Sequence, residues 1–156
     1  MDKVTLRRLS GSDRQGVEGI RPRPDQEHLV SSVEASLAEV ESNDALTPFV
    51  VFDGSQLGLP EPDQRPVGFA VTEEVASVGF ILRLLIDADH QGMGDGCAAM
   101  TELVRRLRLS ADVELVATSH RAENLSMARL CADMGFEAWD TPFTPAPGEV
   151  YLCLRP

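Results

Sequence analysis

The sequence predicts a single domain of mixed α and β structure, α/β or α+β, over residues 1–156. Short apolar runs bounded by glycine and proline are typical of strands. They alternate with longer segments in which apolar residues recur every three or four positions, which is typical of helices. A length of 156 residues, of which 43% are apolar, fits one domain with one core.

The N-terminal part of the chain predicts a strand followed by a helix. Residues 4–9 are strand-like and run into Ser-Gly-Ser-Asp at 10–13, which signals a turn and a helix start. The breaker Arg-Pro-Arg-Pro-Asp at 21–25 ends in an aspartate that is a suitable N-cap. Apolar residues at spacings of three and four then predict an amphipathic helix over residues 26–41.

The middle of the chain predicts strands separated by a long loop. Residues 49–52 and 67–71 are short apolar runs, and residues 54–66 between them are rich in glycine and proline. Residues 78–86 form the longest apolar run, which predicts a central strand that is buried on both faces.

The C-terminal part predicts two helices and two strands in alternation. Residues 97–107 have helical composition and periodicity, and residues 113–118 read as a strand. A helix follows over 124–134, with Gly135 where a helix C-terminal glycine belongs, and residues 150–154 close the chain as a strand.

Charge and cysteine usage exclude several classes of function. Basic residues number 14 and acidic residues 25, so the net charge is −11, which disfavours nucleic-acid partners and attracts cations such as polyamines. No apolar run approaches the roughly 20 residues of a membrane span, and residues 1–6 lack a signal-peptide pattern, so we expect a cytoplasmic protein with no membrane partner. The three cysteines form no CxxC pair and the three histidines are scattered, so we expect no metal site.

The segment Gln-Gly-Met-Gly-Asp-Gly at 91–96 joins the central strand to the following helix. Alternating glycines allow close backbone approach to a ligand, and converging N–H groups at a helix start attract an anion such as pyrophosphate. No Gly-Lys-Ser/Thr sequence of a Walker loop is present, and the spacing G-x-G-x-G differs from that of the dinucleotide fingerprint. A simple strand-to-helix turn is the alternative interpretation.

These residues carry a family resemblance. The loop at 91–96 resembles the Gln/Arg-x-x-Gly-x-Gly/Ala loop of the GCN5-related N-acetyltransferases (GNAT), and Leu84-Leu85-Ile86 before it resembles that family's fourth strand. Residues 124–136 resemble the family's second conserved block: an asparagine, a helix and Gly-Phe. The resemblance implies a GNAT fold, with a mixed, mostly antiparallel central sheet of about six to seven strands and helices on both faces.

Several further segments, among them Val-Gly-Phe-Ala at 67–70 and Gly-Glu-Val at 148–150, resemble the bacterial diamine and polyamine (spermine/spermidine) N-acetyltransferase branch. The resemblance implies transfer of acetyl from acetyl-coenzyme A to a primary amine, first of all a small diamine or polyamine, which attacks the thioester directly in a ternary complex. It also implies a homodimer. An antibiotic amine, an amino acid or a protein N-terminus stays open as the acceptor.

The resemblance implies three groups of residues that bind acetyl-coenzyme A, in a splay between the fourth and fifth strands and at the glycine loop. They are Leu84, Leu85 and Ile86; Gln91, Gly92, Met93, Gly94, Asp95, Gly96 and Cys97; and Asn124, Leu125, Ser126 and Met127. Ala117, Thr118 and Ser119 are expected near the acceptor amine, and Glu27 and Glu73 are further candidates for the acceptor site. His120 is a candidate base because histidine titrates near neutral pH.

Two positions, Cys131 and Asp95, depart from the family pattern, and Gln91 is the less common of the two residues that the pattern allows. Cys131 occupies the place of a tyrosine that serves many relatives as the acid for the leaving group, and a buried core cysteine is the alternative interpretation. Gln91 replaces the commoner arginine, which removes one positive charge. Asp95 puts a carboxylate beside the expected pyrophosphate, which is unfavourable unless its side chain points away. An acyl-coenzyme A sensor without turnover and a nucleotide-binding regulator are therefore the alternative functions.

Overall fold

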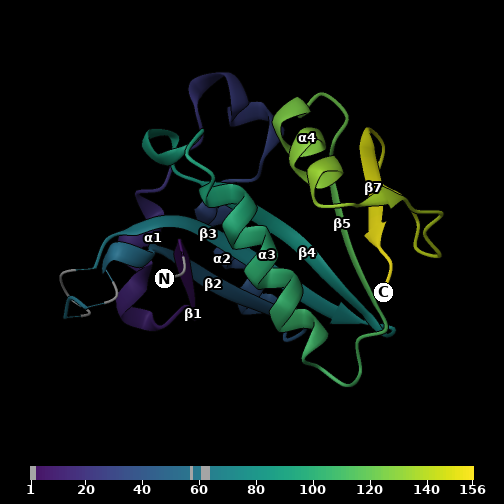
Figure 1. The fold of residues 1–156 in the computed structure, drawn as a ribbon, viewed down its shortest axis with the longest axis horizontal. Helices are drawn as coiled ribbons and strands as arrows, with labels where there is room; N and C mark the ends of the chain where they lie inside the picture. Colours follow the sequence, from purple (N-terminus) through teal and green to yellow (C-terminus); the bar gives the residue numbers. More distant parts are fainter. Residues whose placement is uncertain (1–2, 57, 61–63) are drawn as a thin grey trace.

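The computed structural model describes residues 3–56, 58–60 and 64–156. A seven-stranded sheet in the order β1-β2-β3-β4-β5-β7-β6 forms its centre (Figure 1). The strands are β1 (Val4–Arg8), β2 (Leu46–Asp53), β3 (Pro66–Val75), β4 (Val78–Ile86), β5 (Leu115–Arg121), β6 (Glu137–Ala138) and β7 (Glu149–Leu154). β4 and β5 are parallel, and the other neighbouring strands are antiparallel. The expected mixed, mostly antiparallel sheet is confirmed.

Helices cover both faces of the sheet, as expected. α1 (Arg14–Glu18) and α2 (Val33–Ser42) pack on one face, where Val17, Val33 and Leu37 share a buried cluster with residues of β2 and β3. α3 (Asp95–Arg108) lies across the opposite face (Figure 1), with α4 (Leu125–Asp133) beside it. Met100 and Leu103 of α3 are fully buried there. No helix among the described residues is long and apolar enough to cross a membrane.

The helix expected over residues 26–41 starts later than its apolar pattern indicates. Pro24–Leu29 forms a 3-10 helix, and α2 begins only after Ser32, whose side chain accepts a hydrogen bond from the Ala35 N–H at 3.1 Å. A serine N-cap fixes a helix start more strongly than periodicity does. Val30 nevertheless packs against the same core cluster as α2, so the apolar period continues across the break in the helix.

Strand ends also differ from the sequence expectation. β2 and β3 extend well beyond residues 49–52 and 67–71, because Pro48, Thr72 and other less apolar residues still pair across the ladder. β5 starts later than expected and continues to Arg121, where it pairs with β7. The two-residue strand β6 has no sequence signal of its own. Within the loop expected at 54–66, positions 57 and 61–63 lie outside the described residues.

The sheet forks between β4 and β5. Parallel pairing joins residues 78–81 to residues 115–118 and ends there, while β5 continues its pairing with β7 as far as Arg121. The Thr118 hydroxyl donates to the Ile81 carbonyl at 2.8 Å, at the last paired position before the strands separate. A bulge leaves Leu82 without a partner on β3, and bulges bend and twist a strand. Beyond this point, residues 83–86 of β4 are paired with β3 only.

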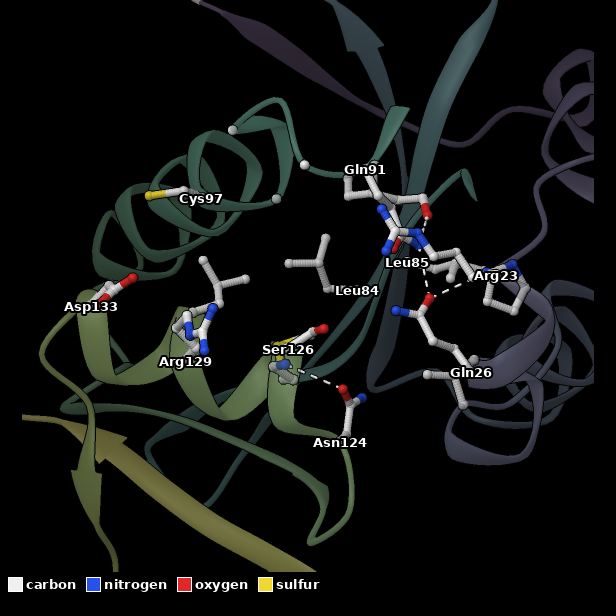
Figure 2. A pocket seen from close by; sticks show the side chains of 18 residues that line it. Arg23, Gln26, Leu84, Leu85, Gln91, Cys97, Asn124, Ser126, Arg129 and Asp133 are labelled. Carbon is white, nitrogen blue, oxygen red and sulfur yellow. Dashed lines mark hydrogen bonds between the residues drawn. The ribbon is translucent and has the colours of Figure 1, made fainter. Parts of the chain in front are cut away.

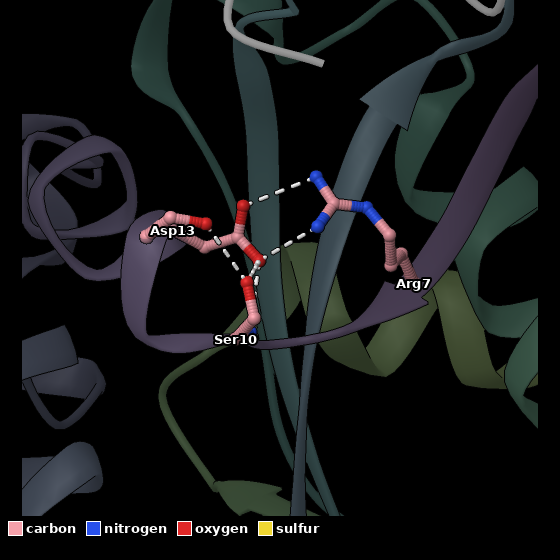
Figure 3. Close-up of polar contacts among 4 residues, drawn as sticks. Arg7, Ser10 and Asp13 are labelled. Atoms are coloured by element: carbon pink, nitrogen blue, oxygen red, sulfur yellow. Dashed lines mark hydrogen bonds and ion pairs between the residues drawn. The ribbon is translucent and has the colours of Figure 1, made fainter.

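A cluster of polar side chains closes the N-terminal corner of the sheet. The Arg7 guanidinium donates two hydrogen bonds to the Asp13 carboxylate, at 2.9 and 3.1 Å (Figure 3). It also lies over the Phe52 ring, 4.9 Å from the ring centroid. The same carboxylate accepts from the Ser10 N–H at 2.9 Å and the Ser10 hydroxyl at 3.0 Å. We call Arg7, Ser10 and Asp13 the N-terminal cluster.

Candidate active site

Two cavities meet at the fork in the sheet. The first, of about 380 Å³, extends from the fork toward the glycine loop and the start of α4. The second, of about 410 Å³, extends from the fork toward α2 and the end of β5. Both are lined by the same five residues at their junction, Val30, Leu84, Leu85, Asn124 and Met127. The two cavities therefore adjoin one another at this junction.

The glycine loop turns sharply at the mouth of the first cavity. Gly92 and Gly94 have φ angles of +80° and +88°, a left-handed region that favours glycine. Gly94 is the N-cap of α3, so the first N–H groups of this helix have no partner within it. Gly92, Gly94 and Gly96 all line the cavity. The loop therefore presents backbone donors and the positive end of a 14-residue helix to an anion.

Gln91 anchors this loop to two neighbouring segments (Figure 2). Its side-chain amide donates to the Ile86 carbonyl at 2.9 Å and to the Gln26 side chain at 3.0 Å, and Gln26 in turn accepts from the Arg23 N–H at 3.2 Å. The glutamine in the usual arginine position thus fixes the 23–26 segment against the end of β4.

Two arginines from other segments bring positive charge to the first cavity. Arg23 and Arg129 both line the first cavity, and a Cβ at Gly92 would have the Arg23 guanidinium as its nearest neighbour, at 4.0 Å. Asp133 is the carboxylate among the described lining residues. Sequence reasoning missed both arginines. The available signal for Arg23 was the Arg-Pro-Arg-Pro segment, because its prolines restrain the backbone and place fixed cations in an acidic chain, whereas Arg129 on α4 has no such signal.

The open side of β4 faces the first cavity. The Asp87 N–H bonds to the Val67 carbonyl of β3, and hydrogen-bonding directions alternate along a strand. The backbone groups of Leu84 and Ile86 therefore face away from β3, toward the fork. Asn124 borders the other side, where its side-chain oxygen caps α4 by accepting from the Met127 N–H at 3.2 Å. Its amide nitrogen has no partner among the described residues.

Most of the residues expected to bind acetyl-coenzyme A line the first cavity. They are Leu84, Leu85, Ile86, Gln91, Gly92, Gly94, Gly96, Cys97, Asn124, Ser126 and Met127. Met93 and Leu125 do not line it; their side chains are exposed. Asp95 is 3% exposed and forms an ion pair with Lys3 at 3.7 Å instead. The carboxylate of Asp95, which looked unfavourable in the sequence, thus points away from the cavity. It is neutralised by Lys3, the residue that precedes β1.

Cys131 lies in the core, as in the alternative interpretation of this residue. It is fully buried in the main cluster with Met100 and Leu103 and lines neither cavity. Burial raises the pKa of the Cys131 thiol to about 11. Its position provides no contact with a ligand in either cavity.

Only some of the residues expected at the acceptor site line the second cavity. Ser119 lines it, whereas Ala117 and Thr118 are buried in the sheet, where Thr118 closes the ladder to β4. Glu27 lies on the 3-10 helix and Glu73 near the far end of β3, and neither lines either cavity. Ser36, Arg83 and Tyr151 line the second cavity and were not expected there.

His120 also lines the second cavity and is 8% exposed. Its Nδ1 lies 2.7 Å from the Arg121 carbonyl, which can only accept, so we assign the ring proton to Nδ1. Nε2 is then the nitrogen with a lone pair, and it has no hydrogen-bond partner among the described residues. The other titratable lining groups are His28, Arg83, Arg121, Glu149 and Tyr151.

No group of three or more histidine, cysteine or carboxylate side chains suited to a metal ion occurs in the described parts of the chain.

The two cavities together form a site with three parts: an anion-binding loop, a strand with unpaired backbone groups and a second cavity with an oriented imidazole. Such a site can hold two ligands and bring them together at the fork.

Comparison with known proteins agrees with this geometry. Residues 18–136 match the family model described as "Acetyltransferase (GNAT) family". No curated protein matches the chain significantly by sequence. Among solved structures, the chain is similar to the aminoglycoside acetyltransferase AAC(6')-Ib in complex with coenzyme A, with 22% identity, a TM-score of 0.75 and coverage of 97% of this chain and 94% of that one.

Two further structures come from other acetyltransferases. The spermidine N-acetyltransferase from Vibrio cholerae, in complex with coenzyme A and spermine, has 16% identity and a TM-score of 0.68, covering 97% of this chain and 93% of that one. A ribosomal-protein alanine N-acetyltransferase from Escherichia coli has 18% identity and a TM-score of 0.69, covering 97% and 92%. These likenesses show a shared fold and favour no single branch.

Proposed function

We propose, from the premise that the chain belongs to the acetyltransferase (GNAT) family, that its first cavity binds acetyl-coenzyme A and its second cavity binds the acceptor. The protein is an acetyl-coenzyme A-dependent N-acetyltransferase. The observation that carries the assignment of the two cavities is their junction at Leu84, Leu85 and Asn124. Two substrates that meet there satisfy the requirement for direct transfer in a ternary complex, which gains from proximity.

The residues of the first cavity fit the chemistry of the co-substrate. The N–H groups of the glycine loop and the Arg23 and Arg129 side chains suit its phosphates, since donors and fixed cations at a helix start bind such groups. The backbone groups of Leu84 and the N–H of Ile86 suit the amides of the pantetheine arm, whereas the Ile86 carbonyl already accepts from the Gln91 side chain. Bound acetyl-coenzyme A supplies an electrophilic thioester carbonyl.

The second cavity supplies the base for the acceptor. An amine attacks only as the neutral form, because a protonated amine has no lone pair. We assign the removal of this proton to Nε2 of His120, which is oriented by the bond of Nδ1 to the Arg121 carbonyl. The new C–N bond forms as the C–S bond breaks, and the thiolate takes its proton from water. Cys131 is not needed, because its side chain lies in the core.

The net charge of −11 favours a cationic amine as the acceptor, and the sequence motifs, taken alone, favour a diamine or polyamine. Glu149 is the carboxylate of the second cavity that suits the ammonium end of such an amine. The homodimer also stays a prediction, and light scattering of the purified protein tests it. The sensor without turnover loses its motivation, because Asp95 points away from the first cavity and Cys131 lies in the core.

The assignment of the first cavity is tested with a matched pair of glycine variants. Gly92 and Gly135 both have a left-handed backbone, with φ of +80° and +91°, but only Gly92 lines the cavity. Gly92→Ala and Gly135→Ala carry a similar conformational cost of about 1 kcal/mol. Isothermal titration with coenzyme A is expected to show at least about tenfold weaker binding for Gly92→Ala and unchanged binding for Gly135→Ala. Equal affinity in both variants would contradict the assignment.

A further inference from the structure

Two residues that line the second cavity each carry a buried polar atom that no group of the described residues satisfies. The two atoms are the hydroxyl oxygen of Ser36 and Nε of Arg83. Both residues line the second cavity, and Ser36 is 2% exposed. Buried polar groups without a partner are rare in native proteins because each one costs free energy. Two such groups that line the same cavity indicate a ligand group that completes them.

The two groups are brought together by α2 and β4. Arg83 donates to the Leu82 carbonyl at 2.9 Å and to the Glu39 carboxylate at 3.3 Å, so both ends of its guanidinium fork are held. Glu39 lies three residues after Ser36 on α2, on the same side of the helix. The Arg83–Glu39 bond therefore places the guanidinium beside the face of α2 that carries Ser36. Its two terminal nitrogens have hydrogen-bond partners, and Nε has none among the described residues.

The chemistry of these atoms restricts the ligand. The Arg83 Nε–H only donates, and a serine hydroxyl donates or accepts, so the ligand must present a hydrogen-bond acceptor. A protonated polyamine offers N–H donors and no acceptor. Arg83 and Arg121 line the cavity together with one carboxylate, Glu149, while their ion-pair partners Glu39 and Glu123 do not line it, so a negatively charged acceptor also improves the charge balance within the cavity. A carboxylate oxygen forms the strongest hydrogen bonds with a guanidinium.

We infer that the acceptor is a small primary amine that also carries a carboxylate, an amino acid rather than a polyamine. Its carboxylate accepts from Arg83 Nε and the Ser36 hydroxyl on the α2 side of the second cavity. Its amine lies on the β5 side, near His120 and Glu149. This inference rests on the proposed function and specifies the substrate class of the same site.

The test uses pairs of amines that differ only in a carboxylate. Lysine is paired with cadaverine, and ornithine with putrescine, and kcat/KM for acetylation of each is measured by mass spectrometry. The expected result is at least about a tenfold preference for the carboxylated member of a pair. Efficient acetylation of cadaverine and putrescine with equal or lower rates for lysine and ornithine would overturn the inference and leave the proposed function standing.

Two variants locate the preference in the cavity. Arg83→Gln is expected to reduce the ratio of the paired kcat/KM values to about one, mainly through KM, and Ser36→Ala to reduce it in part. Glu39→Gln removes the negative charge of the partner of Arg83 but keeps the guanidinium, so the preference is expected to persist. A ratio measured within one variant is insensitive to losses of folded protein. An unchanged ratio in Arg83→Gln would assign the preference elsewhere and contradict the inference.

Binding separates the two proposals. The paired amines are titrated into the complex with coenzyme A, which reports on recognition without turnover. Tighter binding of lysine than of cadaverine supports the carboxylate site even where the rates are low, and equal binding overturns it. Absence of acetylation of every amine, with coenzyme A still bound, would contradict the proposed function itself and not the recognition chemistry that the titration measures.

Discussion

Two parts of the molecule combine an arginine with a serine, and they use their polar atoms differently. In the N-terminal cluster, Arg7 and Ser10 both donate to Asp13, whose carboxylate accepts at 2.9 to 3.1 Å from each (Figure 3). In the second cavity, Arg83 and Ser36 each keep one buried polar atom without a partner among the described residues. The first arrangement is complete without a ligand, and the second is not.

The difference separates two roles of polar residues. A satisfied cluster stabilises the fold, because removing one member leaves the others unpaired. A cluster with an unpaired buried polar atom lowers the stability of the fold. Such a cluster is expected where a bound ligand supplies the missing hydrogen bond, so substitutions there act on substrate recognition. The same substitutions in the two regions should therefore move different observables, free energy of unfolding in one and KM in the other.

The largest effect is expected at the base that we assign. His120→Gln removes the lone pair at Nε2 while keeping a polar side chain of similar size, and general-base catalysis contributes about 10²–10⁴-fold. We expect kcat to fall at least about 100-fold, with KM for acetyl-coenzyme A and the melting temperature little changed. A variant that retains more than about a tenth of the wild-type kcat would remove His120 from the mechanism.

The N-terminal cluster should show the opposite behaviour. Asp13→Ala leaves Arg7 and the Ser10 N–H without their acceptor, and we expect the free energy of unfolding to fall by about 2 kcal/mol. Urea denaturation measures this loss, and kcat/KM of the folded fraction should be unchanged. Asp112→Ala, at an exposed turn, is the control and should leave stability within about 0.5 kcal/mol of wild type. A loss of kcat/KM in the folded fraction of Asp13→Ala would contradict a purely stabilising role for the N-terminal cluster.

The same cluster predicts a dependence of stability on pH. Partial burial raises the pKa of Asp13, but hydrogen bonds from Ser10 and Arg7 outweigh it and hold the pKa below its usual range. A lowered pKa contributes stability above the unfolded-state value of about 3.9, and this contribution is lost as the pH falls through the folded-state value. The difference in unfolding free energy between wild type and Asp13→Asn should therefore shrink from pH 7 to pH 3.

The smallest effect, and the sharpest contrast, compares one substitution in the two regions. Ser10→Ala removes a hydroxyl that is bonded to Asp13, so it should cost about 1 kcal/mol of stability. Ser36→Ala removes a buried hydroxyl without a partner, so stability should stay unchanged or rise by up to about 1 kcal/mol while KM for the acceptor increases. Equal losses of stability in both variants would show that Ser36 is satisfied within the fold.

Local signals predicted much of the fold and of the first cavity. The apolar run at 78–86 is β4, residue for residue, and the alternating glycines do begin a helix at the mouth of a cavity. The start of α2 was misplaced because Val30 packs with that helix while Ser32 caps it. Periodicity reports which residues are buried, whereas a cap decides where the helix begins.

The second cavity could not be predicted in the same way, because it depends on contacts between distant segments. Ser36, Arg83 and Tyr151 belong to α2, β4 and β7, and their proximity follows from the order of strands in the sheet. Thr118 and Asp95, in contrast, were expected at the site but do not line a cavity. Their sequence positions suggested the site, but pairing with Ile81 and Lys3 directs both side chains into the protein.

The distribution of thiols gives the chain a built-in reporter. Cys131 and Cys153 are buried, and Cys97 is exposed on the first turns of α3, where it lines the first cavity. An alkylating dye added to the folded protein should consequently label Cys97, beside the glycine loop that we propose binds the phosphates of the co-substrate. The rate of that labelling provides a direct optical titration of occupancy that needs neither an acceptor nor turnover.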